Sequence, residues 1–287
     1  MIFKNYTDHY YQAVCDFLIE LNRDNKNHIN WNWARFEWMT EHPEFDKSAK
    51  SSIGLWLAGE KVVGAAIYDM YFGEAFCGVL PEYADLYPAV LEYAYNELKD
   101  ENGLGIALCD DCKSEIEAAK AQGFILAEQD ETVMSISLNG DFPVHLPHEL
   151  HFAELDPVKE PYDFQWLLWQ GFDHGTDKEE FEREDRIIPQ IRHHLDPYLS
   201  IAAVDESGEK VAYCCLWYSE KTDYAYVEPL CVIPSYRAKG VAKAIVYEAL
   251  SRARSLGAEK AYVLSDMKFY QRLGFEKEKH FSFYFKQ

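Results

Sequence analysis

The chain has 287 residues, 48% hydrophobic and 15% aromatic, which is enough for two cores, and it contains no apolar run long enough to span a membrane. Its formal net charge of −21 excludes a general nucleic-acid binder, because such proteins need an extended basic face. The seven cysteines are scattered or adjacent and the N-terminus has no signal-peptide pattern, so we expect reduced thiols and a cytoplasmic protein.

The first half of the chain predicts alternating strands and helices. In order, these are a strand at 2–6, a helix at 8–21, strands at 54–58 and 61–70, a helix at 87–98, a strand at 106–109, a helix at 113–122 and two strands up to 138. The aromatic segment 28–39 places Trp31, Arg35 and Trp38 on one side of a helix. This indicates a helix packed into a core or interface, and a wall of a substrate pocket is the alternative.

The second half starts near His151, after a proline-containing segment without periodicity, residues 139–150, that we interpret as a linker. The predicted elements are helices at 161–169 and 178–193, a buried strand at 227–233, a helix from Val241 that ends at Gly257, a strand at 261–265 and a short helix capped by Gly274.

The two halves form a sequence repeat. Residues 59–64, 79–83 and 121–124 match residues 208–213, 232–236 and 272–275, each at a spacing of about 150 residues. Three matches in register over the length of a domain predict two tandem α/β domains, residues 1–140 and 151–287.

Residues 227–243 of the second copy combine a strand, a tight basic loop with a glycine and the start of a helix. The first N–H groups of a helix have no internal partner, and the helix dipole is positive at that end. Gly240 allows close approach to the main chain, while Arg237, Lys239 and Lys243 add positive charge. This pattern predicts an anion site, with an ordinary strand-to-helix turn as the alternative reading.

These features resemble the GNAT superfamily of acyl-CoA-dependent N-acetyltransferases. The family has a hydrophobic strand, an Arg/Gln-x-x-Gly-x-Gly/Ala loop, a helix, a second strand and a Tyr shortly before Leu-Gly-Phe. This chain has them at 230–233, 237–242 and Tyr270 before 273–275, and it has Ser265 where the family often has Asn. The resemblance covers residues 198–287. It implies an α/β fold with mixed sheets, two tandem GNAT-like domains, acetyl-CoA as co-substrate and a small-molecule primary amine as acceptor.

The resemblance also assigns site residues. The implied cofactor-binding positions are Leu230, Cys231, Val232, Arg237, Ala238, Lys239, Gly240, Val241, Ala242, Lys243 and Ser265. A backbone N–H near Val232 is the implied oxyanion donor, and Tyr270 occupies the position of the family's general acid.

Glu228 is the candidate base, because it is the only carboxylate on the central strand. A surface position or a contact to the substrate ammonium are its alternatives, and Asp173 and His174 are reserve candidates for the base. Trp169, Phe172, Asp173 and His174 are expected to shape the acceptor site, although the two aromatic residues are equally consistent with core positions.

The first copy has lost the features of the anion site. Aligned at the shared proline, residues 84–89 bring Ala84, Asp85 and Tyr87 to the positions of Arg237, Ala238 and Gly240. The position of Tyr270 becomes Ala119. We interpret this copy as structural, or as a wall of the acceptor pocket.

We expect no metal, since the Cys109–Cys112 pair is a lone C-x-x-C and the histidines at 145, 148 and 151 are separated by a proline. Two other functions stay open, a non-catalytic acyl-CoA-binding protein and an aminoacyl transferase of the paired-GNAT type. The acidic charge disfavours the aminoacyl transferase, because its tRNA substrate requires a basic surface. The oligomeric state is left open.

Overall fold

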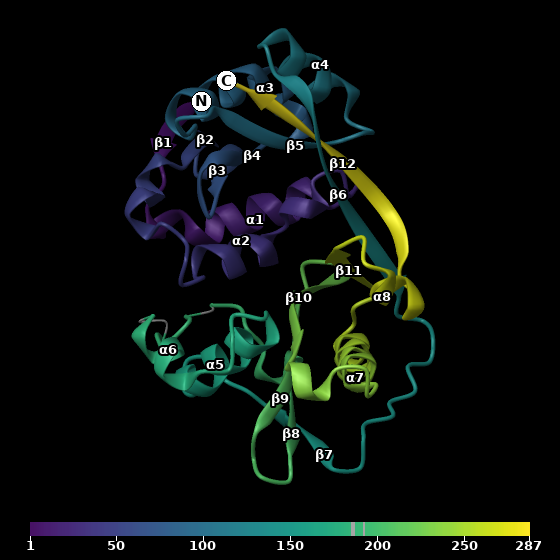
Figure 1. The fold of residues 1–287 in the computed structure, drawn as a ribbon. Coiled ribbons are helices and arrows are strands. Elements are labelled where there is room, and N and C mark those ends of the chain that lie inside the picture. The colour runs from purple at the N-terminus through teal and green to yellow at the C-terminus, as the bar shows by residue number, and fades with distance from the viewer. Residues whose placement is uncertain (185–186, 192) are drawn as a thin grey trace. The chain divides into compact units, whose positions relative to one another are not determined.

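The computed structural model describes residues 1–184, 187–191 and 193–287, which form two compact units (Figure 1). The first unit contains residues 1–134, 264–270 and 276–287, and the second contains residues 135–263 and 271–275. The predicted α/β class is confirmed, because both units combine helices with parallel and antiparallel strand pairs. The predicted domains follow the sequence repeat, whereas the compact units depart from it near the C-terminus.

The first unit is a mixed sheet with helices on both faces. Its strand order is β1 (Ile2–Asn5), β2 (Gly54–Ala58), β3 (Lys61–Asp69), β4 (Tyr71–Val79), β5 (Leu104–Cys109), β12 (Glu276–Lys286) and β6 (Ile125–Ser137). Its helices are α1 (Tyr11–Leu21), α2 (Trp33–Thr40), α3 (Tyr87–Glu97) and α4 (Lys113–Ala121). Neighbouring strands from β1 to β4 are antiparallel, and β4 pairs with β5 in parallel.

Strand β3 lies at the centre of this core. Its residues from Val62 to Tyr68 are all buried, which explains the unbroken apolar run in the sequence, since a strand covered on both faces cannot alternate with polar residues. Helices α1 and α2 lie on one side of the strands and α3 on the other (Figure 1). Trp31 and Trp38 are buried, which agrees with the predicted core packing. The predicted single helix is wrong at its start, because Trp31 ends a separate 3-10 turn and the extended Asn32 caps α2.

The last strand of the chain, β12, completes the first unit. It pairs antiparallel with β5 from Phe281↔Cys109 to Lys286↔Leu104. The Tyr95 hydroxyl donates a hydrogen bond to the carbonyl of Gln287 at 2.6 Å. The two strands predicted at the end of the first copy are instead one long strand, β6.

A group of carboxylates surrounds one arginine in the first unit. The Arg35 Nη2 atom lies 2.7 Å from Asp69 Oδ2, and its Nη1 atom lies 3.9 Å from Glu131 Oε1. Burial raises the pKa of the nearby Glu74 carboxyl to about 7, with further contributions from Asp69 and Glu131, while Arg35 acts in the opposite direction.

The second unit is also a mixed sheet combined with helices. Its strand order is β11 (Lys260–Leu264), β10 (Tyr224–Val232), β9 (Lys210–Tyr218), β8 (Ser200–Asp205) and β7 (Leu150–Glu154). Its helices are α5 (Pro161–Gly171), α6 (Lys178–Arg183) and α7 (Val241–Ser255), and α8 (Lys268–Arg272) begins in the first unit and ends in the second. The pair β10–β11 is parallel, and the pairs from β10 to β7 are antiparallel.

The helix predicted at 178–193 is wrong beyond its first turns. Helix α6 ends at Arg183, and residues 187–191 are not helical. Pro189 accounts for the non-helical backbone at residues 188 and 189, because proline lacks the N–H that a continuing helix needs and disfavours helical backbone in the residue before it. Residues 185, 186 and 192 of that prediction lie outside the described residues.

All seven cysteines are buried and free. Within the described residues, no helix has both the length and the apolar character needed to cross a membrane.

Candidate active site

Strand β10 changes direction at its midpoint. Its pairing with β9 contains a bulge between Val227 and Leu230, where Glu228 and Pro229 form a cis peptide. Pro229 has no N–H to offer to a strand ladder. On the other edge, pairing with β11 runs only from Tyr224 to Tyr226. Beyond this point the main chain of β10 leaves its parallel neighbour, so its polar groups are available to a ligand.

The loop after β10 leads into α7 through two left-handed residues. Ala238 has φ +61° and Gly240, which caps the helix, has φ +84°. A non-glycine residue in this region costs about 1–2 kcal/mol and is typical of ligand-binding turns. The cap makes no side-chain hydrogen bond, so the first N–H groups of this 15-residue helix lack the usual capping oxygen. Such a helix start attracts anions.

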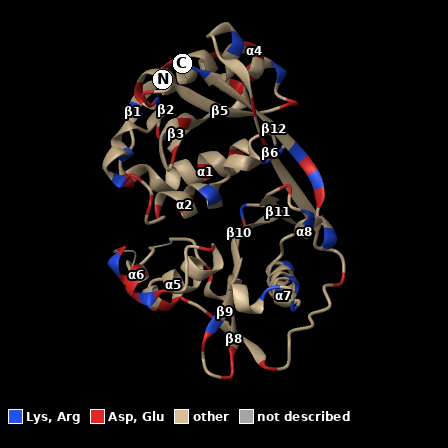
Figure 2. Cartoon of the chain, in the orientation of Figure 1, with Lys and Arg blue, Asp and Glu red and all other residues tan. Residues whose placement is uncertain are grey.

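The lysines of this loop lie over aromatic rings. The Lys239 ammonium is 4.6 Å from the centre of the Tyr236 ring, and the Lys243 ammonium is 5.1 Å from that of Tyr247. Lys and Arg lie on and around α7 as well as on other elements, and Asp and Glu are spread over most of the chain (Figure 2). The structure thus brings the predicted basic positions together at one helix start.

Arg237 makes contacts that the sequence did not predict. Its Nε–H donates to the carbonyl of Val232 at 3.0 Å, and Nη2–H donates to the carbonyl of Gly171 at 2.9 Å. Its Nη1 atom lies 2.9 Å from the Asp173 carboxylate. Three of its five N–H donors are thus used within the protein. Arg237 therefore ties the cofactor loop to the end of α5.

Glycine permits the close packing of α5 on β10. A Cβ atom at Gly171 would lie 2.6 Å from the Cβ atom of Cys231, closer than real side chains allow. This contact fixes the segment that follows α5, in which Phe172 is 48% exposed and Asp173 and His174 are also exposed.

Trp169 has the core role that the sequence left open. It is buried and packs against Phe181, with ring centres 5.8 Å apart, and against His174 at 5.0 Å. Of the four predicted acceptor residues, three are therefore exposed at the end of α5, and the buried Trp169 packs against one of them, His174.

Glu228 is partly exposed on the bulge of β10. Its backbone carbonyl accepts a hydrogen bond from Trp217 Nε1–H at 2.6 Å, which fixes the main chain on which the candidate base is carried. The family-implied positions Leu230, Cys231 and Val232 follow on the same strand, with Leu230 the least buried.

Tyr270 and Ser265 belong to the segment 264–270 of the first unit. Tyr270 is 7% exposed and makes an edge contact with Phe269, with ring centres 5.1 Å apart. The Ser265 N–H donates to the carbonyl of Thr132 at 2.8 Å, and its hydroxyl accepts from the Met267 N–H at 3.1 Å. The roles of Tyr270 and Ser265 stay predictions.

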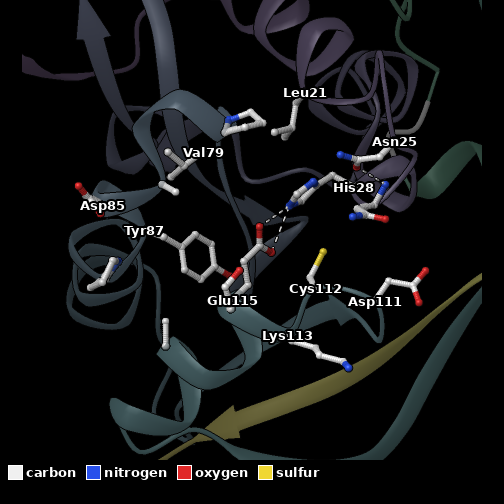
Figure 3. A pocket seen from close by; sticks show the side chains of 16 residues that line it. Leu21, Asn25, His28, Val79, Asp85, Tyr87, Asp111, Cys112, Lys113 and Glu115 are labelled. Carbon is white, nitrogen blue, oxygen red and sulfur yellow. Dashed lines mark hydrogen bonds and ion pairs between the residues drawn. The ribbon is translucent and has the colours of Figure 1, made fainter.

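The first unit contains a cavity of about 630 Å³ that sequence reasoning missed (Figure 3). It is lined by the segment 84–89, which aligns with the anion-site loop of the second copy and includes Asp85 and Tyr87, and by the start of α4. His28 Nε2 lies 3.1 and 3.2 Å from the two carboxylate oxygens of Glu115. Burial lowers the pKa of His28, but the Glu115 carboxylate outweighs burial and the net direction is upward. His28 and Glu115 are 87 residues apart, so no local spacing could have revealed them.

The chain is similar to known acetyltransferases in part of its sequence. Residues 161–275 match the family model of the acetyltransferase (GNAT) family. The uncharacterized N-acetyltransferase YhbS of Escherichia coli strain K12 is 28% identical over 105 residues, which cover 35% of this chain and 63% of that protein. The chain therefore spans less than two thirds of the length of this curated relative.

Two solved structures share the fold over nearly the whole chain. A tandem GNAT protein from the clavulanic acid biosynthesis pathway has a TM-score of 0.63 at 13% identity and covers 99% of this chain and 98% of its own. A GCN5-related N-acetyltransferase from Sphaerobacter thermophilus has a TM-score of 0.56 at 14% identity and covers 99% and 95%. Residues 161–275, within the second repeat, are thus similar to the GNAT family, and the chain shares the fold of a tandem GNAT protein over nearly its whole length.

Proposed function

We propose that the chain is an N-acetyltransferase that moves the acetyl group of acetyl-CoA to a primary amine of a small molecule. The main support is the combination of a strand that leaves its neighbour at Tyr226 and a helix start capped by left-handed Gly240. The first offers main-chain groups to the extended arm of coenzyme A. The second offers free N–H groups and positive charge to its phosphates.

The proposed chemistry uses residues near the end of β10 and the start of α7. The amine nitrogen attacks the thioester carbon, the C–N bond forms, and the C–S bond breaks as the tetrahedral intermediate collapses. We assign a main-chain N–H near Val232 to stabilise the oxyanion. We assign Glu228 to take the proton of the amine, directly or through water, and Tyr270 to give its hydroxyl proton to the leaving thiolate.

The acceptor side suits a cationic molecule. Asp173 and His174 are exposed beside Phe172 at the end of α5, and Arg237 holds this segment against the cofactor loop. The exposed Phe172 ring can contact an ammonium group by a cation–π interaction, whereas the Asp173 carboxylate is already paired with the Arg237 guanidinium. We further propose that the protein acts in the cytoplasm, in keeping with seven free cysteines, and without nucleic acid.

The deciding experiment measures thiol release from acetyl-CoA with a library of primary amines, each paired with its N-acetylated form. We expect steady release with at least one primary amine and none with the acetylated partner, because the acetylated nitrogen is no longer nucleophilic. Calorimetric binding of coenzyme A without any turnover would replace the proposal with a non-catalytic acyl-CoA-binding protein. Failure to bind coenzyme A would reject both.

A further inference from the structure

The cavity of the first unit gathers three side chains with metal-ligating atoms. One ligand atom each of His28, Cys112 and Glu115 lies within 4.8 Å of the other two. His28 precedes α2, and Cys112 and Glu115 lie at the start of α4. Figure 3 shows the Cys112 sulfur and the Glu115 carboxylate both directed toward the His28 ring. Cys112 is 8% exposed, and the side chains of His28 and Glu115 are 12% and 18% exposed.

A buried hydroxyl without a partner points to the same place. Tyr87 is 4% exposed, and its Oη atom is buried without a hydrogen-bond partner, as is His28 Nδ1. A buried donor of this kind costs about 1–3 kcal/mol unless something accepts its hydrogen bond. An ion pair between His28 and Glu115 alone leaves this hydroxyl unexplained.

The donor set and its spacing fit one class of ion. Imidazole nitrogen, thiolate sulfur and carboxylate oxygen are the three ligand types of zinc, and three protein ligands with one open position are typical of accessible zinc sites. In a tetrahedral site the nitrogen and oxygen ligand atoms lie about 3.4 Å apart, and nitrogen and sulfur about 3.6 Å. The observed 3.1 Å between His28 Nε2 and Glu115 Oε1 is close to this value.

We propose that the first unit binds one zinc ion through His28, Cys112 and Glu115. The fourth position faces the cavity, where a metal-bound water supplies the acceptor for the Tyr87 hydroxyl. This site is distinct from the acetyl-transfer site proposed above, because the two share no residue. It departs from the prediction that the chain holds no metal, which weighed only the lone Cys109–Cys112 spacing and three other histidines.

Cys109 supports the site without being one of its ligands. Its thiol donates to Asn27 Oδ1 at 3.9 Å, and its backbone carbonyl accepts the N–H of Cys112 at 2.8 Å. With Cys112 bound to the ion, we expect the Cys109 thiol to turn and donate to the bound thiolate. Donors to a metal ligand of this kind orient it and tune its strength.

The test uses the full chain after dialysis against a chelator. Zinc is titrated in competition with a chromophoric chelator, and cobalt is added separately as a spectroscopic probe, because a cobalt–thiolate bond absorbs in the near ultraviolet. We expect one zinc ion per chain and a cobalt–thiolate band in the wild-type protein. Cys112→Ser should remove the band and weaken zinc binding at least tenfold, and Glu115→Gln should also weaken zinc binding at least tenfold.

Two matched variants separate this site from general thiol or carboxylate binding. Cys109→Ser keeps a hydroxyl donor beside Cys112, so the cobalt–thiolate band should persist. Asp85→Asn removes a carboxylate of the same cavity and should change zinc affinity less than twofold. Circular dichroism of every metal-free variant checks that it is folded. No zinc binding by the wild type, equal effects of Asp85→Asn and Glu115→Gln, or a thiolate band that survives Cys112→Ser would overturn the proposal.

Discussion

The assignment of the phosphate site can be tested at Gly240 with two variants that differ in one charge. Gly240→Asn and Gly240→Asp have the same shape, and a Cβ atom at this position meets no atom within 4 Å. Both must adopt φ +84°, a conformation in which Asn and Asp are the best tolerated of the non-glycine residues. The difference between the two variants therefore isolates the effect of a negative charge at the start of α7.

The size of that difference follows from Coulomb's law. A unit charge about 5 Å from a phosphate charge is repelled by about 0.8 kcal/mol in bulk water and about 3.3 kcal/mol at an effective dielectric of 20. Because Gly240 is exposed, we expect a value of about 1–2 kcal/mol. This corresponds to coenzyme A binding that is about five- to thirtyfold weaker in the Asp variant than in the Asn variant.

Isothermal calorimetry with coenzyme A gives the measurement. We expect one coenzyme A per chain, and we expect the gap between the two variants to narrow as salt is raised. Gly59→Asn and Gly59→Asp are the matched controls, since Gly59 has φ +67° and open space around it in the first unit. Equal affinity of the two Gly240 variants at low salt, or two equivalent sites per chain, would refute the phosphate assignment.

Four further predictions concern single residues. Tyr270→Phe should lower turnover about a hundredfold or more with little change in acetyl-CoA affinity, since only the proton donor is lost; an effect on affinity alone, seen by comparing kinetics with calorimetry, would make Tyr270 a binding residue. Glu228→Gln should lower turnover by a similar factor, and the loss should shrink as pH rises because more amine is already neutral; full activity at neutral pH would remove Glu228 from the mechanism. Gly171→Ala should lower the free energy of unfolding by about 1–3 kcal/mol in urea titrations, because its new methyl group overlaps Cys231; unchanged stability would show that α5 can shift. The raised pKa of Glu74, about 7 against an ordinary 4.5, means that wild-type stability falls as pH rises through this window. Glu74→Gln should therefore raise the free energy of unfolding by about 1–3 kcal/mol at pH 8 and by almost nothing at pH 4.5, and a gain independent of pH would contradict this reasoning.

The anion-site loop and the flanking elements of the second copy could be predicted from sequence, because each is defined by residues that are close together in the chain. The strand before Pro234, the glycine at 240 and the Leu-Gly-Phe end are each defined by residues within one turn of each other. The shared proline also aligned Tyr87 with Gly240, and the structure buries that tyrosine in the first unit.

Contacts between residues far apart in sequence could not be read in this way. Nothing near Arg237 indicates that it pairs with Asp173, 64 residues earlier, because an exposed arginine in a basic loop is equally consistent with a free phosphate ligand. His28 begins the aromatic segment 28–39, and no metal-ligating residue follows it at a spacing typical of a metal site. Only the fold brings it to Glu115 and Cys112.

The pairing of β12 with β5 determines when the first unit can be finished. The Ser282 hydroxyl donates to Asp110 across 172 residues, so this part of the unit has a high contact order. During synthesis on the ribosome, the edge of β5 that pairs with β12 stays unpaired until nearly the whole chain has emerged. An unpaired strand edge is a template for aggregation, so the interval favours protection by chaperones. The first repeat produced alone lacks this strand, and the second produced alone carries a strand without its partner, so we expect neither repeat to fold completely by itself.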